Sequence, residues 1–161
     1  MFALCFTVCM PSATKLDFHW ILPAKLAQGS YPEPPIAAFG PFDTVVFAAE
    51  ELQPKLRALP RNKQAVFVPM DDDPYRPIPK PAETRILDVG RALAEEVQAG
   101  RRVLVTCAMG ANRSGILTGA TLIALGYPGK EAVRLIRERR HLGGNEKALF
   151  NPVFRAFVAA R

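Results

Sequence analysis

The sequence predicts a single α/β domain, with a central, mostly parallel sheet flanked by helices. Short apolar runs alternate with segments of helical periodicity, which is the order of elements in such folds. The chain has 161 residues, enough for one domain with a sizeable core. Hydrophobic residues make up 49% and charged residues 22%, as in globular proteins rather than disordered ones. We therefore expect one domain over residues 1–161, in which residues 1–25 form an irregular N-terminal extension.

Three short segments are predicted to be buried strands, because they combine β-branched, aromatic and small apolar residues. They are residues 44–48, 65–68 and 102–106. Two proline-rich stretches, at residues 31–35 and 73–81, are expected to be loops. Proline fixes φ and removes a backbone donor, so these stretches cannot continue a strand or a helix.

Helical periodicity is clearest between the second and third predicted strands, where apolar residues recur every three or four positions and Gly100 follows as a C-cap. Gly126 ends a second periodic segment, and Gly143 ends a third. The predicted helices are residues 82–99, 114–125 and 130–140, with a short helix after Pro152.

The net charge of +6 favours polyanionic or phosphorylated partners, and a solvated basic face is the plainer interpretation. Basic and aromatic residues do not interleave as in nucleic-acid binders, so a nucleic-acid partner is open but unsupported. No apolar run reaches the roughly 18 residues of a membrane helix. Much of the positive charge lies on one predicted helix, at Arg134, Arg137, Arg139 and Arg140.

The three cysteines are Cys5, Cys9 and Cys107. Their odd number argues against a disulfide scaffold, and without a CxxC or a Cys/His cluster no metal site and no cofactor are expected. No basic residue precedes the apolar start of the chain, as it would in a secretory signal, so a reducing cytoplasm is the expected location. Cys5 and Cys9 are interpreted as small buried hydrophobes, with a redox partnership to Cys107 as the alternative.

The third predicted strand leads into a glycine-containing loop that ends where a helix begins. A loop at a helix N-terminus can turn its N–H groups inward to bind an anion, and the helix dipole adds positive potential. That field favours the thiolate of Cys107, and Gly110 allows tight curvature. Arg113 offers a planar, bidentate fork for two phosphate oxygens. The predicted phosphate-binding loop runs Cys107-Ala108-Met109-Gly110-Ala111-Asn112-Arg113-Ser114.

A cysteine at the end of a buried strand is usually a small core residue, and that is the alternative to a nucleophile. The joint pattern of Cys107, five residues, Arg113 and Ser114 between a strand and a helix is much rarer. It resembles the Cys-x5-Arg-Ser/Thr signature of the protein-tyrosine-phosphatase superfamily, and is most similar to the dual-specificity phosphatase branch. The resemblance extends over about residues 26–157 and includes Asn151 and Phe154, which resemble a closing Asn-x-x-Phe.

The resemblance implies the phosphatase fold and a phosphocysteine intermediate. It implies that Cys107 is the nucleophile, that Arg113 binds phosphate and that Ser114 assists the sulfur as it leaves. One departure is Thr106, which stands where the family usually has His, so the thiolate must be supported by the loop and by Ser114.

A general acid must protonate the leaving oxygen and then activate water. Asp71, Asp72 and Asp73 are the candidates. The lead-in Val68-Pro69 resembles the segment that carries the family's acid and selects Asp72. Asp71 and Asp73 remain alternatives, and a solvated turn is the plainer interpretation, because a run of Asp before Pro is good turn chemistry.

The function expected from this resemblance is hydrolysis of phosphomonoesters on proteins, chiefly phosphotyrosine and secondarily phosphoserine or phosphothreonine. A lipid substrate is less favoured, because no Lys lies between Cys107 and Arg113. Three other activities remain open: removal of RNA 5′-phosphates, a catalytically weak phosphate-binding module, which Thr106 favours, and a rhodanese-like sulfurtransferase. The physiological substrate and the oligomeric state are not predicted.

Overall fold

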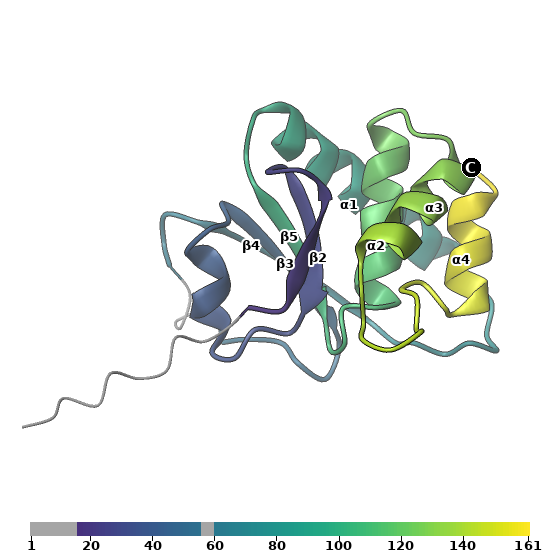
Figure 1. The fold of residues 1–161 in the computed structure, drawn as a ribbon, viewed down its shortest axis with the longest axis horizontal. Coiled ribbons are helices and arrows are strands. Elements are labelled where there is room, and N and C mark those ends of the chain that lie inside the picture. The colour runs from purple at the N-terminus through teal and green to yellow at the C-terminus, as the bar shows by residue number, and fades with distance from the viewer. Residues whose placement is uncertain (1–15, 56–59) are drawn as a thin grey trace, which may run out of the picture.

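A computed structural model describes residues 16–55 and 60–161 (Figure 1). Five strands form one sheet in the order β1-β2-β5-β3-β4, and only β1 runs antiparallel to its neighbour. The predicted α/β class with a mostly parallel sheet is therefore confirmed. The strands are β1 (Phe18–Leu22), β2 (Leu26–Ser30), β3 (Thr44–Ala49), β4 (Gln64–Met70) and β5 (Val103–Cys107).

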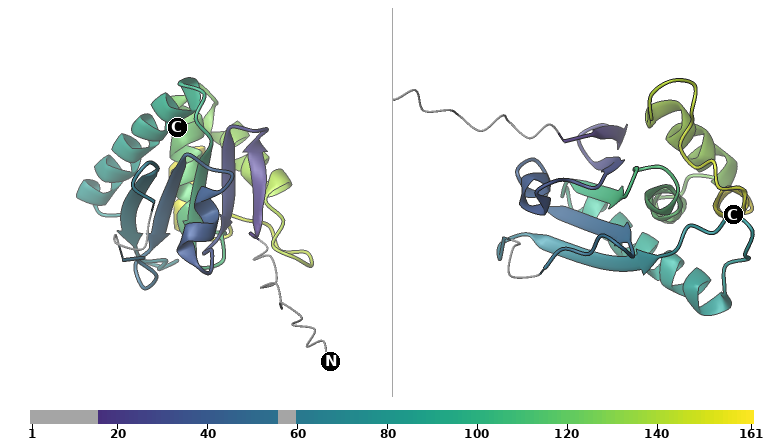
Figure 2. Two further views of the ribbon diagram at one scale, coloured as in Figure 1. Left: turned by 90° about the vertical axis from the view of Figure 1, so that its left-hand side faces the viewer. Right: turned by 90° about the horizontal axis from the view of Figure 1, so that it is seen from below.

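Four α-helices cover one face of the sheet, and one short 3-10 helix, η1 (Pro35–Phe39), lies on the other face (Figures 1 and 2). The predicted helices are all present, with ends shifted by one or two residues. They are α1 (Lys80–Gln98), α2 (Arg113–Ala124), α3 (Gly129–Arg139) and α4 (Pro152–Ala159). In the described parts of the chain, no helix is both long and apolar enough to cross a membrane.

Side chains alternate between the two sides of each strand, so the hydrophobic core consists of two clusters, one on each face of the sheet. In β3, Val46 belongs to the helix-side cluster, whereas Val45 and Phe47 belong to the cluster under η1. In β5 the same alternation places Cys107 on the helix side and Leu104 on the other. The nucleophile candidate therefore points toward the N-terminus of α2, which follows it.

The expectation of an irregular extension over residues 1–25 is wrong for β1. Its side chains alternate, with Ile21 in the helix-side core and Phe18 and Trp20 packed against the opposite cluster. This alternation marks a strand with two covered faces. Residues 1–15, including Cys5 and Cys9, lie outside the described residues.

Strand β2 was also missed, because Ala27, Gln28, Gly29 and Ser30 have low intrinsic strand preference. Its central position between β1 and β5 decides its conformation. A side chain at Gly29 would meet the Asp17 carbonyl oxygen at 2.6 Å, so the small residue permits the close approach of the chain just before β1.

Candidate active site

Cys107 lies at the carboxyl end of β5, in the middle of the sheet. Its side chain is only 3% exposed, and its sulfur lies 3.2 Å from the Ser114 hydroxyl oxygen in the first turn of α2. Ligands in open parallel sheets bind at this end of the strands, where the next helix begins. The structure therefore brings the predicted nucleophile and the predicted assisting hydroxyl into contact.

Each backbone carbonyl from residue 108 to residue 112 accepts a hydrogen bond. The donors lie outside the concave side of the loop. Tyr31 N–H donates to the Ala108 oxygen, at 3.3 Å, and Leu149 N–H to the Ala111 oxygen, at 3.1 Å. The Gln28 amide donates to the oxygens of Gly110 and Ala111 at 3.0 and 3.1 Å.

Outward carbonyls leave the N–H groups of the same peptides directed inward. Within the described residues, no backbone N–H from 108 to 112 has a protein acceptor. This is the arrangement expected of an anion-binding loop at a helix N-terminus.

Arg140 is the second anchor of the loop and is only 1% exposed. Its guanidinium donates to the carbonyls of Met109 and Gly110, both at 3.0 Å. It also forms a bidentate pair with Asp17 at 2.8 and 2.7 Å, and this contact lowers the pKa of the Asp17 carboxyl. Burial, and then the nearby Arg140 charge, lower the pKa of His19. The His19 Nδ1 lies 2.9 Å from the Arg140 guanidinium, which can only donate.

The interpretation of these arginines as a solvated basic face is therefore wrong for Arg140, which is buried, and for Arg137, which is half-buried. Besides Arg140, Arg139 donates to the Ile21 carbonyl at 2.6 Å and Arg137 to two carbonyls near the loop. Arg134 and Arg139 are both exposed, and Arg134 pairs with Glu131 and Glu138.

Gly110 has a φ of +67°, as the predicted tight curvature requires. A Cβ at this position would lie 2.5 Å from the Gly29 oxygen and 2.6 Å from the Ser30 nitrogen, so backbone would have to move. The loop can pass over β2 only where the side chain is absent.

We expect Gly110→Ala to lower the free energy of unfolding by about 1–3 kcal/mol and to abolish binding of inorganic phosphate. Thermal unfolding and phosphate-dependent stabilisation would measure both effects. Gly126→Ala is the matched control, because Gly126 also has a positive φ, of +95°, but nothing lies within 4 Å of its added Cβ. Equal losses of phosphate binding in the two variants would contradict the steric explanation.

Arg113 is held by Glu51, a residue that the sequence analysis did not identify. Both terminal nitrogens of Arg113 donate to the Glu51 carboxylate, at 2.5 and 2.7 Å. The bond to Arg113 lowers the pKa of Glu51 to about 2, and the same bond raises the pKa of Arg113. The pair therefore stays ionised at neutral pH.

The third nitrogen of the Arg113 guanidinium, Nε, is buried and unpartnered among the described residues. An unpartnered buried donor is costly, and a guanidinium has a second bidentate edge that includes Nε. That edge fits two oxygens of a phosphate group.

Asp72 is the one member of the acidic run that contacts the loop. Its two oxygens accept from the side-chain amides of Asn112, at 3.1 Å, and Asn151, at 2.7 Å. The orientation of each amide is fixed, because the Asn112 oxygen accepts from Asn151 N–H and the Asn151 oxygen caps α4 by accepting from Val153 and Phe154 N–H. Both amides therefore present donors, and Asp72 is held as an acceptor at the edge of the loop.

Asp71 and Asp73 form their polar contacts within the turn itself. Asp73 accepts from Tyr75 N–H at 2.8 Å and pairs with Arg76, and Asp71 accepts from Asp72 N–H at 2.8 Å. The turn interpretation thus describes Asp71 and Asp73, while the geometry separates Asp72 from them.

Thr106 is completely buried, and its hydroxyl donates to the Val46 carbonyl at 2.7 Å. Its hydroxyl is therefore used within the sheet, between β5 and β3. Because side chains alternate along β5, Thr106 and Cys107 lie on opposite faces.

No protein-family model matches the chain, and no curated protein matches it. Solved structures do. A mouse putative dual specificity phosphatase, in complex with zinc tungstate, is 22% identical, with a TM-score of 0.69 over 94% of this chain and 90% of its own. Human DUSP28 is 22% identical, with a TM-score of 0.65 over 88% and 89%. Tk-PTP in its active form is 22% identical, with a TM-score of 0.69 over 90% and 97%. The chain therefore has the fold of the dual-specificity phosphatases.

Proposed function

We propose that this protein is a cysteine-dependent phosphatase that hydrolyses phosphomonoesters through a phosphocysteine intermediate. The observation that carries the proposal is the Nε of Arg113, unpartnered among the described residues, beside a cysteine in a loop whose carbonyls all accept from donors outside the loop. A nucleophile and an anion cradle in one loop supply the two parts of covalent phosphoryl transfer. A reducing cytoplasmic location belongs to this proposal, since the thiol must stay free.

In the first step, the Cys107 thiolate attacks phosphorus, and the bond from phosphorus to the substrate oxygen breaks. The inward N–H groups and Arg113 stabilise charge on the three remaining oxygens. Protonated Asp72 transfers its proton to the leaving oxygen, so that an alcohol or phenol departs rather than its anion.

In the second step, water attacks the phosphocysteine, and Asp72, now ionised, accepts a proton from that water. The amides of Asn112 and Asn151 hold Asp72 in this acceptor form. The sulfur leaves as a thiolate, and the Ser114 hydroxyl, 3.2 Å away, donates to it. Inorganic phosphate and the free enzyme result.

Phosphotyrosine on proteins is the proposed principal substrate, with phosphoserine and phosphothreonine as secondary substrates. Met109 in the loop is 57% exposed and Phe150, next to Asn151, is 47% exposed. Exposed apolar side chains beside a phosphate site offer contact to an aromatic ring.

The test is rapid quench of the wild-type protein with an aryl phosphate in acid, followed by mass spectrometry of the peptide that contains Cys107. A phosphoryl group on Cys107 that appears before steady state and decays with turnover is the expected result. Turnover without any phosphocysteine would overturn the proposed mechanism.

A phosphate-binding module without turnover is the second candidate, and Thr106 favours it. Its hydroxyl is committed to the Val46 carbonyl, so it gives Cys107 no support. Two further measurements separate the functions: stabilisation of the protein by inorganic phosphate against heat, together with no release of phenol from an aryl phosphate at any pH, supports the binding module.

A further inference from the structure

The Gly110 carbonyl of the phosphate-binding loop accepts two hydrogen bonds, from donors that lie far from it in the sequence. Nε of Arg140 and the side-chain amide of Gln28 each donate to it at 3.0 Å. The same peptide unit carries the N–H of Ala111 on its opposite side, because a peptide bond is planar and trans. Holding this carbonyl therefore orients a donor toward the anion, and the firmness of the hold depends on how Arg140 itself is fixed.

The Arg140 guanidinium has five N–H donors, and the structure gives it five acceptors. Two are the carbonyls of Met109 and Gly110, and two are the carboxylate oxygens of Asp17. The fifth is Nδ1 of His19, at 2.9 Å. Arg140 thus links the loop to β1, and His19 is the one acceptor of the set whose side chain ordinarily titrates near neutral pH.

The contact between Arg140 and His19 requires a neutral imidazole. A guanidinium has no acceptor, so Nδ1 accepts from it only while that nitrogen carries a lone pair. A second proton on the ring would replace the acceptor by a donor and place two positive charges side by side. Burial, and next the Arg140 charge, lower the pKa of His19 below its ordinary value of about 6.5.

The groups around His19 come from three directions. Asp17 precedes it on the same strand, and Gln28 is its register partner on β2. The exposed His141 follows Arg140 in the chain, and its ring centroid lies 5.2 Å from that of His19. A charge on His141 lowers the pKa of His19 further, whereas the Asp17 carboxylate raises it.

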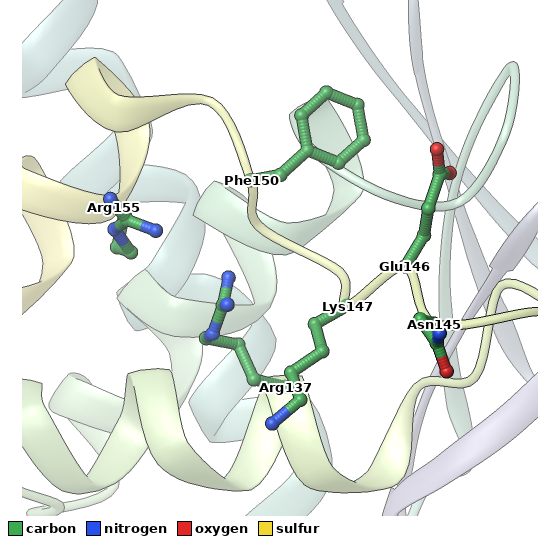
Figure 3. Close-up of a pocket in the computed structure, with 6 residues that line it drawn as sticks. All are labelled: Arg137, Asn145, Glu146, Lys147, Phe150 and Arg155. Carbon is green, nitrogen blue, oxygen red and sulfur yellow. The ribbon is translucent and has the colours of Figure 1, made fainter.

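The other cations of α3 and the segment after it are directed elsewhere. Arg139 donates to the Ile21 carbonyl at 2.6 Å. Figure 3 shows Arg137 pointing into a pocket of about 420 Å³, which Lys147 also lines and His19 does not. Among the described residues, the charged or titratable groups that act on His19 are Asp17, Arg140 and His141.

We propose that His19 is a positioning residue for the phosphate-binding loop, whose neutral imidazole completes the acceptors of Arg140 and whose protonation weakens binding of an anion in the loop. The inference rests on the proposed function and adds a regulation of the same site by pH.

The direction follows from proton binding. The state with the Arg140 contact binds fewer protons than the state without it, so the contact is fully stabilising above about pH 6.5 and is progressively lost as the pH falls below that value. Asp17 does not share this change, because the bond to Arg140 lowers the pKa of its carboxyl.

The test measures binding of sulfate to the Cys107→Ser protein at about pH 8 and pH 5. Sulfate stays a dianion over this range, so a change in affinity belongs to the protein. The reference is the same protein with His19→Asn, because an asparagine oxygen can accept where Nδ1 does and has no proton to gain. At pH 8 the two proteins should bind alike, and at pH 5 the protein with His19 should bind about tenfold more weakly. Contributions of Asp72 to the pH dependence are common to both proteins and cancel in their ratio.

Two further variants separate the acceptor from the ring. His19→Leu removes the acceptor, so it should weaken sulfate binding at both pH values. His141→Asn is the matched control, since it removes the neighbouring ring without touching Arg140, and it should keep the loss at pH 5. The same ratio at pH 8 and pH 5, or a loss at pH 5 that disappears only in His141→Asn, would overturn the inference.

An NMR titration of the His19 ring in the Cys107→Ser protein gives the same answer without a substitution at His19. If protonation weakens sulfate binding, bound sulfate must lower the pKa of His19. The plain attraction of a dianion would raise it, and a raised value would contradict the role of His19. Absence of wild-type turnover would overturn the proposed enzyme, and the sulfate measurements would still decide what His19 does.

Discussion

Replacing Cys107 by serine is expected to reduce hydrolysis of an aryl phosphate by about four orders of magnitude or more. A serine hydroxyl is not ionised at neutral pH, and it is the weaker nucleophile without an adjacent base. The variant keeps the outward carbonyls, Arg113 and Glu51, because none of these contacts involves the sulfur. Steady-state release of phenol measures the loss.

Binding provides the control for this prediction. Inorganic phosphate should stabilise Cys107→Ser against heat about as much as it stabilises wild type. Hydrolysis that survives the substitution would place the nucleophile elsewhere. Loss of both hydrolysis and phosphate binding would indicate a disrupted loop instead.

Asp72→Ala is expected to reduce hydrolysis of phenyl phosphate by about 10²–10⁴-fold, the usual contribution of a general acid. The loss should shrink for a phosphate ester of a strongly electron-poor phenol, because that leaving group departs as an anion without a proton. A merely structural role for Asp72 would not produce this dependence on the leaving group. Turnover of a series of substituted phenyl phosphates measures it.

Asp73→Ala is the matched control, since it removes a carboxylate from the same turn without touching the loop. Asp73 accepts from Tyr75 N–H, so its loss should affect the turn and leave the leaving-group dependence intact. The assignment of Asp72 fails if Asp73→Ala, and not Asp72→Ala, shows the selective loss on poor leaving groups.

The sequence was sufficient for the fold class and for the centre of the site. Cys107, Arg113 and Ser114 are fixed by local order, because a strand, a loop and a helix that follow one another bring them together. The three parallel strands with β-branched and aromatic residues were also identified. Strand β1 was missed although its aromatic and apolar residues favour a strand. Strand β2 was missed because a polar, glycine-containing segment becomes a strand only through its neighbours in the sheet.

The residues that hold the loop and Arg113 in place could not be predicted from the sequence, for a similar physical reason. Glu51, Gln28 and Arg140 act through contacts 62, 82 and 30 residues away in the chain, and nothing in their local sequence indicates the partner. Arg140 was even grouped with solvated charges, because helical spacing cannot reveal that the last arginine turns inward. Among the three aspartates, the resemblance of the Val68-Pro69 lead-in favoured Asp72, and the contacts of Asn112 and Asn151 with Asp72 now separate it from Asp71 and Asp73.

The anchoring of the loop by Arg140 has a consequence for how the protein is made. Asp17 and Arg140 are 123 residues apart, and Asp72 and Asn151 are 79 apart. Domains emerge from the ribosome in N- to C-terminal order, so the sheet and Cys107 appear before the residues that brace them. A nascent chain that ends before α3 would carry the thiol in an unsupported loop. Competence for phosphate binding should therefore arrive late in synthesis, when the last helices dock.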